Sequence, residues 1–210
     1  MRRALKRGLE GSNGISSCLL HQNNAKGQGG KDMDWYDKLS RYFPEHEMKH
    51  PEQIHELLNH HDAYQKMETG EYIATYAEFP KFVFIDYLLV NPNTRGRGLG
   101  TKVLDRFKQM GKTIIVEVEP VQADDEDTAR RVRFYEKNGF TKAEHIEYIR
   151  SDEDGQSFQM DIYYWSEEQV SERTILQQIA AVCTEIHNFK SLKYYGRDIA
   201  DPDEVLNWVQ

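Results

Sequence analysis

A glycine-rich stretch with two arginines stands between an apolar run and an amphipathic segment, and it constrains the fold more than any other feature. The apolar run FVFIDYLLV covers residues 82–90, NTRGRGLG covers 93–100 and GTKVLDRFKQMG covers 100–111. The apolar residues of the last segment recur at the spacing of one helical face: Val103, Leu104, Phe107 and Met110. The order therefore predicts a strand, then a glycine loop, then a helix.

Such a loop can hold a negatively charged group. Glycines let backbone N–H groups converge because no Cβ limits φ or blocks a close approach. A helix that starts directly afterwards adds unpaired N–H groups and the positive end of its dipole. Arg95 and Arg97 add fixed charge. The stretch therefore predicts a cradle for a pyrophosphate, although it matches neither the Walker pattern nor the dinucleotide fingerprint.

The rest of the chain alternates between helical and strand-like patterns. HPEQIHELLNHH predicts a helix over 50–61, and EYIATYAEF predicts a strand over 71–79 that forms a hairpin with 82–90. Further on we expect a strand over 113–120, a helix in the segment 129–140 that Asn138–Gly139 stops, and a hairpin over 142–165. The tail predicts a helix with Ile175, Ile179, Val182 and Ile186 on one face, and a short final helix over 201–209. We take Asp127 as the N-cap of the helix over 129–140.

Composition excludes several classes of protein. The net charge of −8 disfavours a general nucleic-acid-binding protein, so an anion site has to be local. Cys18 and Cys183 lie far apart, which fits a reducing compartment, and we expect a cytoplasmic location. No apolar run approaches the roughly 20 residues that cross a bilayer, so we expect no membrane partner.

Three regions differ in character. Residues 1–32 are rich in Gly, Asn, Ser and Lys, and we expect them to lack fixed structure. Residues 33–166 carry the alternating elements and form the expected domain, and 167–210 form a helical extension. The apolar stripe of this extension packs either on the domain or on a second subunit, and a homodimer is therefore one of two alternatives.

Two short motifs carry a resemblance to a known family. Arg95, Gly98 and Gly100 form an Arg-x-x-Gly-x-Gly pattern after LLVNP, and RFYEKNGF follows at 133–140. In this order the motifs resemble the GNAT superfamily of acyl-CoA-dependent N-acetyltransferases. The likeness covers about 52–165 and is sharpest over 86–140. It implies an α+β fold with a mixed, mostly antiparallel central sheet flanked by helices on both faces.

The resemblance also implies a cosubstrate, acetyl-CoA. Backbone groups of Leu89 and Val90 would bond the pantetheine arm. The pyrophosphate would be wrapped by one continuous segment: Arg95, Gly96, Arg97, Gly98, Leu99, Gly100 and Thr101. The chain departs from the family at Thr128 and Arg131, where many members carry asparagine and alanine. Thr128 can still donate a hydrogen bond, and Arg131 could meet a phosphate instead.

Acetyl transfer to an amine needs an acid for the leaving thiolate and a donor for the developing oxyanion. Tyr135 is the expected acid, because the resembled family places the tyrosine of this motif beside the sulfur. A phenol with a pKa near 10 is protonated at neutral pH and can donate to the thiolate. A backbone N–H near Val90 would meet the oxyanion, at the point where the two central strands part in this family.

The strand TIIVEVEP offers the candidates for the base. Glu117 and Glu119 interrupt an otherwise apolar strand and share one face, roughly 6–7 Å apart. Two such carboxylates in a cleft predict a raised pKa for one of them, which suits a general base. Glu117 also matches the glutamate of ribosomal-protein N-terminal acetyltransferases, so we place it first, Glu119 second and Asp86 third. The alternative is that these acids only solvate an exposed strand end.

Two further features bear on substrate and metal. The acidic run at 124–127 either borders the acceptor site and favours a cationic amine, or only solvates a loop and caps a helix. HELLNH places its second histidine one residue too late for the zinc motif, so we expect no metal.

The function implied is an N-acetyltransferase that moves an acetyl group from acetyl-CoA to an unidentified primary amine by direct attack in a ternary complex. The alternative is a non-catalytic acyl-CoA-binding sensor or protein-interaction module on the same fold.

Overall fold

The structure is a computed structural model that describes residues 34–91, 98–152 and 155–210, which belong to one compact unit. The expectations for residues 1–32, and the expected cofactor contacts of Arg95, Gly96 and Arg97, lie outside the described residues.

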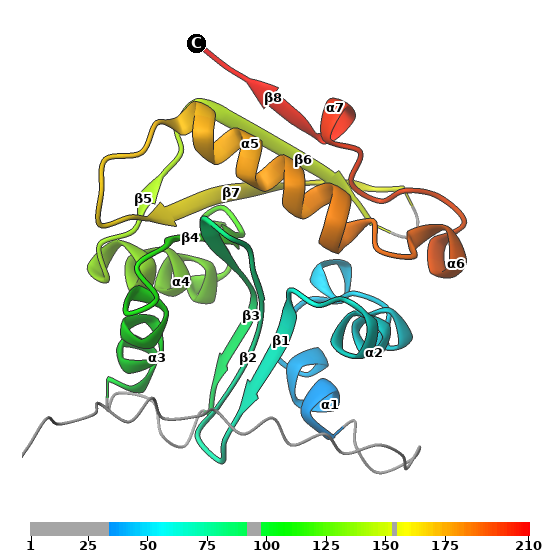
Figure 1. The fold of residues 1–210 in the computed structure, drawn as a ribbon, viewed down its shortest axis with the longest axis horizontal. Coiled ribbons are helices and arrows are strands. Elements are labelled where there is room, and N and C mark those ends of the chain that lie inside the picture. Colours follow the sequence, from blue (N-terminus) through cyan, green and yellow to red (C-terminus); the bar gives the residue numbers. More distant parts are fainter. Residues whose placement is uncertain (1–33, 92–97, 153–154) are drawn as a thin grey trace, which may run out of the picture. The chain divides into compact units, whose positions relative to one another are not determined.

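A single mixed sheet forms the centre of the fold (Figure 1). Its strands lie in the order β1 (Tyr64–Glu68), β2 (Tyr72–Glu78), β3 (Phe82–Val90), β4 (Thr113–Val118), β7 (Ser157–Trp165), β6 (Ile146–Ser151) and β8 (Leu206–Trp208), and the short β5 (Thr141–Lys142) also pairs with β7. Among the strands of the described residues, β3 and β4 alone run parallel, and the other pairs are antiparallel. The mixed, mostly antiparallel sheet expected from the family resemblance is confirmed.

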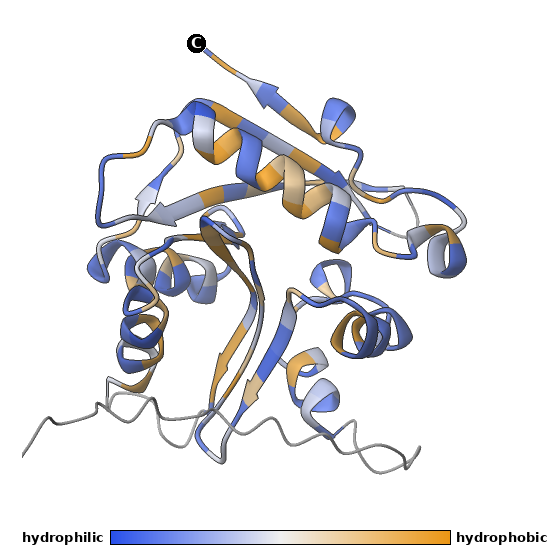
Figure 2. Cartoon of the chain, viewed as in Figure 1, coloured by the Kyte–Doolittle hydropathy of each residue, from blue (hydrophilic) through white to orange (hydrophobic). Residues whose placement is uncertain are grey.

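Helices cover both faces of this sheet, as expected. The first face carries α1 (Asp34–Ser40), α2 (Pro51–His60) and α5 (Glu172–Val182), and the second carries α3 (Leu99–Lys108) and α4 (Glu126–Lys137). Side chains alternate along β3, so Phe82 and Phe84 join the first core while Val83 and Ile85 join the second. Figure 2 shows the hydrophobic residues concentrated on the central strands.

The tail is built into the first core rather than beside it. Ile175, Ile179 and Val182 of α5 are fully buried there. The helix then widens into a π-helical turn, η3 (Cys183–His187), where the N–H of Asn188 bonds the carbonyl of Cys183. A short α6 (Ser191–Tyr195) follows.

The expected last helix and one expected cap are wrong. The helix α7 (Pro202–Val205) ends early, and the next three residues form β8, which pairs with β6. Trp208 is held there between the His145 ring and the Arg173 guanidinium, whose carbon lies 3.6 Å from the indole centroid. The N-cap of α4 is Asp125, whose carboxylate accepts a hydrogen bond from the N–H of Asp127.

Within the described residues, no helix has both the length and the hydropathy that crossing a membrane requires.

Candidate active site

The two parallel strands separate near the middle of the sheet and leave a cavity between them. Their pairing runs from Phe82–Thr113 to Ile85–Val116 and stops, although β3 continues to Val90 and β4 to Val118. A cavity of about 510 Å³ opens at this divergence and is bordered by α3 and α4. One edge of β3 beyond Ile85 therefore faces the cavity instead of a neighbouring strand.

A bulge in β3 turns two polar side chains to the same face. Thr75 of β2 pairs with Tyr87 and Tyr76 pairs with Ile85, which leaves Asp86 as the additional residue. Asp86 bonds the Tyr64 hydroxyl, and both Tyr64 and Tyr87 belong to the first core. The bulge therefore brings Asp86 to the border of the cavity, on the same face of the sheet as Tyr64 and Tyr87 of the first core.

The start of α3 forms one end of the cavity. Gly98 is the N-cap, with a left-handed φ of 71° and no capping side chain, so the first N–H groups of the helix are not covered by one. Gly98, Leu99, Gly100 and Thr101 all line the cavity. A Cβ at Gly100 would lie 2.8 Å from the Phe134 ring, so any other residue there would force that ring to shift.

The two residues of β3 that were expected to contact the cosubstrate, Leu89 and Val90, have side chains in different places. Val90 lines the cavity. The side chain of Leu89 points to the first core and does not line it.

Tyr135 lies on α4 and lines the same cavity. Its ring packs at 5.2 Å from Phe134 and 5.3 Å from Phe140, measured between centroids. Burial raises the pKa of this phenol above its ordinary value, and the nearby Arg131 charge only partly offsets that. The hydroxyl is therefore protonated at neutral pH and available as a donor.

Glu117 lies on β4, directly after the last residue that pairs with β3, and only 8% of its side chain is exposed. Its Oε1 lies 2.7 Å from Nε2 of His187, and its Oε2 accepts a hydrogen bond of 3.2 Å from Arg150. Burial by itself would raise the pKa of Glu117, but these two contacts and the Lys49 charge outweigh it and lower the pKa to about 2. The raised pKa expected for one of Glu117 and Glu119 is therefore not found at Glu117.

His187 is the partner that holds Glu117, and it comes from the π-helical turn of the tail. Its ring is completely buried, and burial lowers its pKa to about 4, so the ring is neutral at pH 7. A neutral ring with its proton on Nε2 can donate to Glu117. Its Nδ1 has no hydrogen-bond partner among the described residues, as this tautomer allows.

Glu119 and Asp86 are also engaged by cations. Glu119 accepts hydrogen bonds of 2.5 Å from Arg131 and 2.6 Å from Gln122. Asp86 accepts 2.5 Å bonds from the Lys49 ammonium and the Tyr64 hydroxyl. Glu119 and the side chain of Asp86 are buried, so neither serves merely to solvate an exposed strand end.

The departures from the family pattern have local explanations. The Thr128 hydroxyl donates to the carbonyl of Asp125 and accepts from the N–H of Gln122, which fixes the turn before α4. Arg131 binds the carboxylates of Glu119 and Glu47, so its partners are acids. The acidic loop contributes the cap Asp125, while Asp127 lines the cavity.

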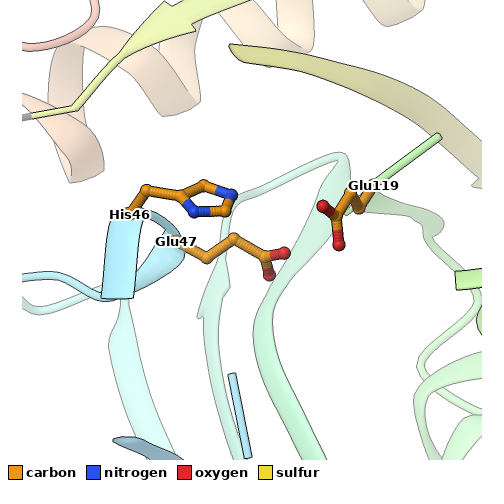
Figure 3. Close-up of side chains that lie close together, drawn as sticks. All are labelled: His46, Glu47 and Glu119. Carbon is orange, nitrogen blue, oxygen red and sulfur yellow. The ribbon is translucent and has the colours of Figure 1, made fainter. Parts of the chain in front are cut away.

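Glu47 is the acidic group that the sequence did not indicate. It lies in a 3-10 turn, η1 (Glu45–Glu47), and lines the cavity, with its carboxylate 3.4 Å from the Arg131 guanidinium of α4. Figure 3 shows the Glu47 and Glu119 carboxylates facing each other, with the His46 ring beside them. Burial and repulsion by Glu119 raise the pKa of Glu47 to about 7, although Arg131 opposes this.

His46, Glu47 and Glu119 also place ligand atoms within 4.8 Å of one another, a spacing that suits a metal ion. The guanidinium of Arg131 already supplies positive charge there, because Nη2 binds Glu119 at 2.5 Å and Nη1 lies 3.4 Å from Glu47. The cluster therefore has its cation from the chain itself.

Comparisons with known proteins agree with this architecture. A family model described as an acetyltransferase (GNAT) domain matches residues 55–142. A Bacillus subtilis (strain 168) protein named "Putative acetyltransferase YjbC" is 43% identical over 179 residues, which are 84% of this chain and 93% of the relative. A solved structure described as "Putative acetyltransferase from GNAT family", from Bacteroides thetaiotaomicron, shares 20% identity with a TM-score of 0.60, over 71% of this chain and 89% of its own. The chain therefore belongs to the GNAT superfamily of acetyltransferases.

Proposed function

We propose that the protein transfers an acetyl group from acetyl-CoA to a primary amine by direct attack in a ternary complex. The observation that carries this proposal is one continuous cavity. The cavity connects the start of α3, where the N-cap Gly98 has no side chain and an anion would bind, with the place where transfer would occur. The protonated phenol of Tyr135 and a group of buried acids lie at that second place.

The cavity suits the parts of acetyl-CoA in turn. The N–H groups at Leu99, Gly100 and Thr101 would receive the pyrophosphate, because a helix start offers unpaired donors and a positive dipole. Arg95, Gly96 and Arg97 complete this cradle in the proposal. The edge of β3 that β4 leaves free would bond the pantetheine amides near Val90, and an N–H there would also meet the oxyanion.

Tyr135 acts as the acid in the proposed reaction. The amine nitrogen attacks the thioester carbon, a C–N bond forms and the C–S bond breaks. The phenol gives its proton to the departing sulfur, which would otherwise leave as a thiolate. General acid catalysis of this kind contributes about 10²–10⁴-fold to the rate.

Glu117 and Glu119 belong to the proposed site, where we assign them the role of holding arginine side chains in position. Glu117 lines the cavity, but a carboxylate with a pKa of about 2 accepts a proton poorly at neutral pH. We assign it to holding Arg150 in place at the border of the cavity. Glu119 orients Arg131, so both acids set the charge around the reacting atoms.

The acceptor in this proposal is a primary amine. Glu47, Asp86, Glu117 and Asp127 line the cavity, and each of the four has a cation within 3.4 Å that balances its charge. Asp127 is itself paired with Arg130 at 2.7 Å. A panel of acceptors should therefore include neutral as well as cationic amines.

The experiment measures release of free thiol from acetyl-CoA over a panel of polyamines, aminoglycosides and peptides. We expect Tyr135→Phe to lower kcat by about 10²-fold or more while acetyl-CoA still binds by calorimetry. Tyr164→Phe is the matched control, since this tyrosine lies outside the cavity lining. If acetyl-CoA binds but no amine gives release above background, the protein is a binding module instead; if it does not bind, the proposal fails entirely.

A further inference from the structure

Glu47 occupies a distinctive place among the acids that line the cavity. Asp86 has both oxygens engaged at 2.5 Å, and Glu117 has one oxygen on His187 and the other on Arg150. The two Glu47 oxygens, in contrast, lie 3.4 and 3.5 Å from Nη1 of Arg131, which makes this a weak contact. The shorter contact of Arg131, 2.5 Å from Nη2, goes to Glu119. Its carboxylate is therefore the least firmly paired acid on the α2 side of the cavity.

The backbone around Glu47 is held by hydrogen bonds to a buried tyrosine. The Tyr87 hydroxyl donates to the carbonyl of Glu47 at 2.8 Å and accepts a hydrogen bond of 2.9 Å from the N–H of Lys49. Tyr87 belongs to the buried segment of β3 after the bulge. The bulge thus anchors the turn that presents Glu47, which favours a defined position for the carboxylate.

Several ionisable groups face this carboxylate from the neighbouring elements. They are Arg131 and Tyr135 from α4, Glu119 after β4, His46 from the same turn and Tyr42 from the segment before it. Arg131 favours the ionised carboxylate and Glu119 disfavours it. Tyr135 and Glu47 both line the cavity.

We infer that Glu47 is the catalytic base that takes the proton from the acceptor ammonium, an inference that rests on the proposed acetyl transfer. The pKa of about 7 supports this role, since a base is most effective when its pKa is close to the working pH. A carboxylate with an ordinary pKa would be ionised but too weakly basic, and Glu117 is weaker still.

The proton balance of the step is complete. One ammonium proton moves to a Glu47 oxygen and from there to solvent, which frees the lone pair that attacks the thioester carbon. Tyr135 gives its proton to sulfur as the C–S bond breaks. The second proton, lost from nitrogen as the amide forms, returns to Tyr135. The products are the N-acetylated amine and coenzyme A thiol.

The test is the pH dependence of kcat for the acetyl-CoA reaction with the best amine found in the panel. Wild type is expected to gain activity through an ionisation near pH 7. Glu47→Gln is expected to lose about 10²-fold in kcat and to lose this ionisation. Glu45→Gln is the matched control, because Glu45 is an exposed acid on the same turn.

Two further measurements separate a chemical role from a structural one. Acetyl-CoA affinity by calorimetry should stay within about twofold in Glu47→Gln, because the proposed pyrophosphate contacts lie at α3. Carbon NMR of labelled glutamate side chains should show one carboxyl that titrates near pH 7 in wild type and is missing from Glu47→Gln. Arg131→Met should move the activity profile to higher pH, since it removes the charge that lowers the pKa of Glu47.

The outcomes distinguish the two proposals. If wild type acetylates amines and Glu47→Gln keeps its rate and pH profile, the base is another group while the acetyltransferase stands. The inference also fails if no carboxyl lost in Glu47→Gln titrates near pH 7. If wild type acetylates no amine, the proposed function fails and the role of Glu47 in it fails too.

Discussion

At the scale of single residues, the site depends on positions where a side chain is absent. Gly98 has a φ of 71°, which L-residues adopt at a cost of about 1–2 kcal/mol, and among the described residues no atom comes within 4 Å of a Cβ built there. The same position is the N-cap of the helix that would hold the pyrophosphate. Strain and charge introduced here therefore act directly on the proposed cofactor site.

We predict that Gly98→Glu weakens acetyl-CoA binding by at least about tenfold, or ~1.4 kcal/mol, because it adds a carboxylate where the pyrophosphate would lie. Gly196→Glu is the control, since Gly196 has nearly the same φ of 70° but lies at the end of α6. Isothermal calorimetry measures both. Equal affinity in Gly98→Glu and wild type would remove the start of α3 as the pyrophosphate site.

The sequence predicts those site residues whose position follows from the order of neighbouring elements along the chain. Gly98, Gly100 and Tyr135 stand in short motifs on a strand, a loop and helices that their own neighbours determine, and the structure brings them to one cavity. Glu47 and His187 could not be reached in this way. Each acts through a partner about 70 residues away, Glu119 or Glu117, and no periodic pattern encodes such a contact.

At the scale of elements, the pattern of the tail helix α5 likewise does not identify the distant residues that it packs against. Its apolar stripe predicted a packed helix but left the partner open, and the structure gives the first core as the partner. The last helix was wrong in part, because Leu206–Trp208 form a strand only through pairing with β6, about 60 residues earlier. Pairing of this kind is a property of the assembled sheet, and local propensity does not decide it.

We predict that Ile179→Ala destabilises the protein by about 2–5 kcal/mol, because Ile179 is fully buried on α5 and its removal leaves a cavity in the first core. Gln177→Ala, at an exposed position of the same helix, should change stability by less than about 0.5 kcal/mol. Urea unfolding monitored by circular dichroism measures both. A small effect of Ile179→Ala would mean that α5 is not part of the cooperative core.

The π-helical turn makes a second prediction at this scale. His187→Leu should destabilise the protein by about 1–3 kcal/mol, since it leaves one Glu117 oxygen buried without its donor. His60→Leu, at an exposed histidine of α2, is the control. In Glu117→Gln the loss from His187→Leu should be smaller, because the oxygen left unpaired is no longer charged. Purely additive losses in the double variant would argue against a direct interaction.

At the scale of the whole molecule, Glu47 and His187 make stability depend on pH in opposite directions. Folding raises the pKa of Glu47 from 4.5 to about 7, so its contribution is complete below pH 4.5 and is lost as pH rises through 7. Folding lowers the pKa of His187 from 6.5 to about 4, so its contribution is complete above pH 6.5 and is lost as pH falls through 4. Between pH 4.5 and 6.5 the two trends oppose each other.

We predict that single variants expose the two trends that wild type balances. In this window one proton corresponds to about 1.4 kcal/mol per pH unit. Relative to wild type, the free energy of unfolding of Glu47→Gln should therefore rise with pH, because only the His187 term is left of the pair. That of His187→Gln should fall with pH for the converse reason, and the double variant should run parallel to wild type. The measurement is urea unfolding at several pH values from 4.5 to 6.5, compared as differences between variants so that the other carboxylates cancel. A Glu47→Gln curve parallel to wild type would show that Glu47 titrates in its ordinary range, and it would count against Glu47 as the base by a route that needs no substrate.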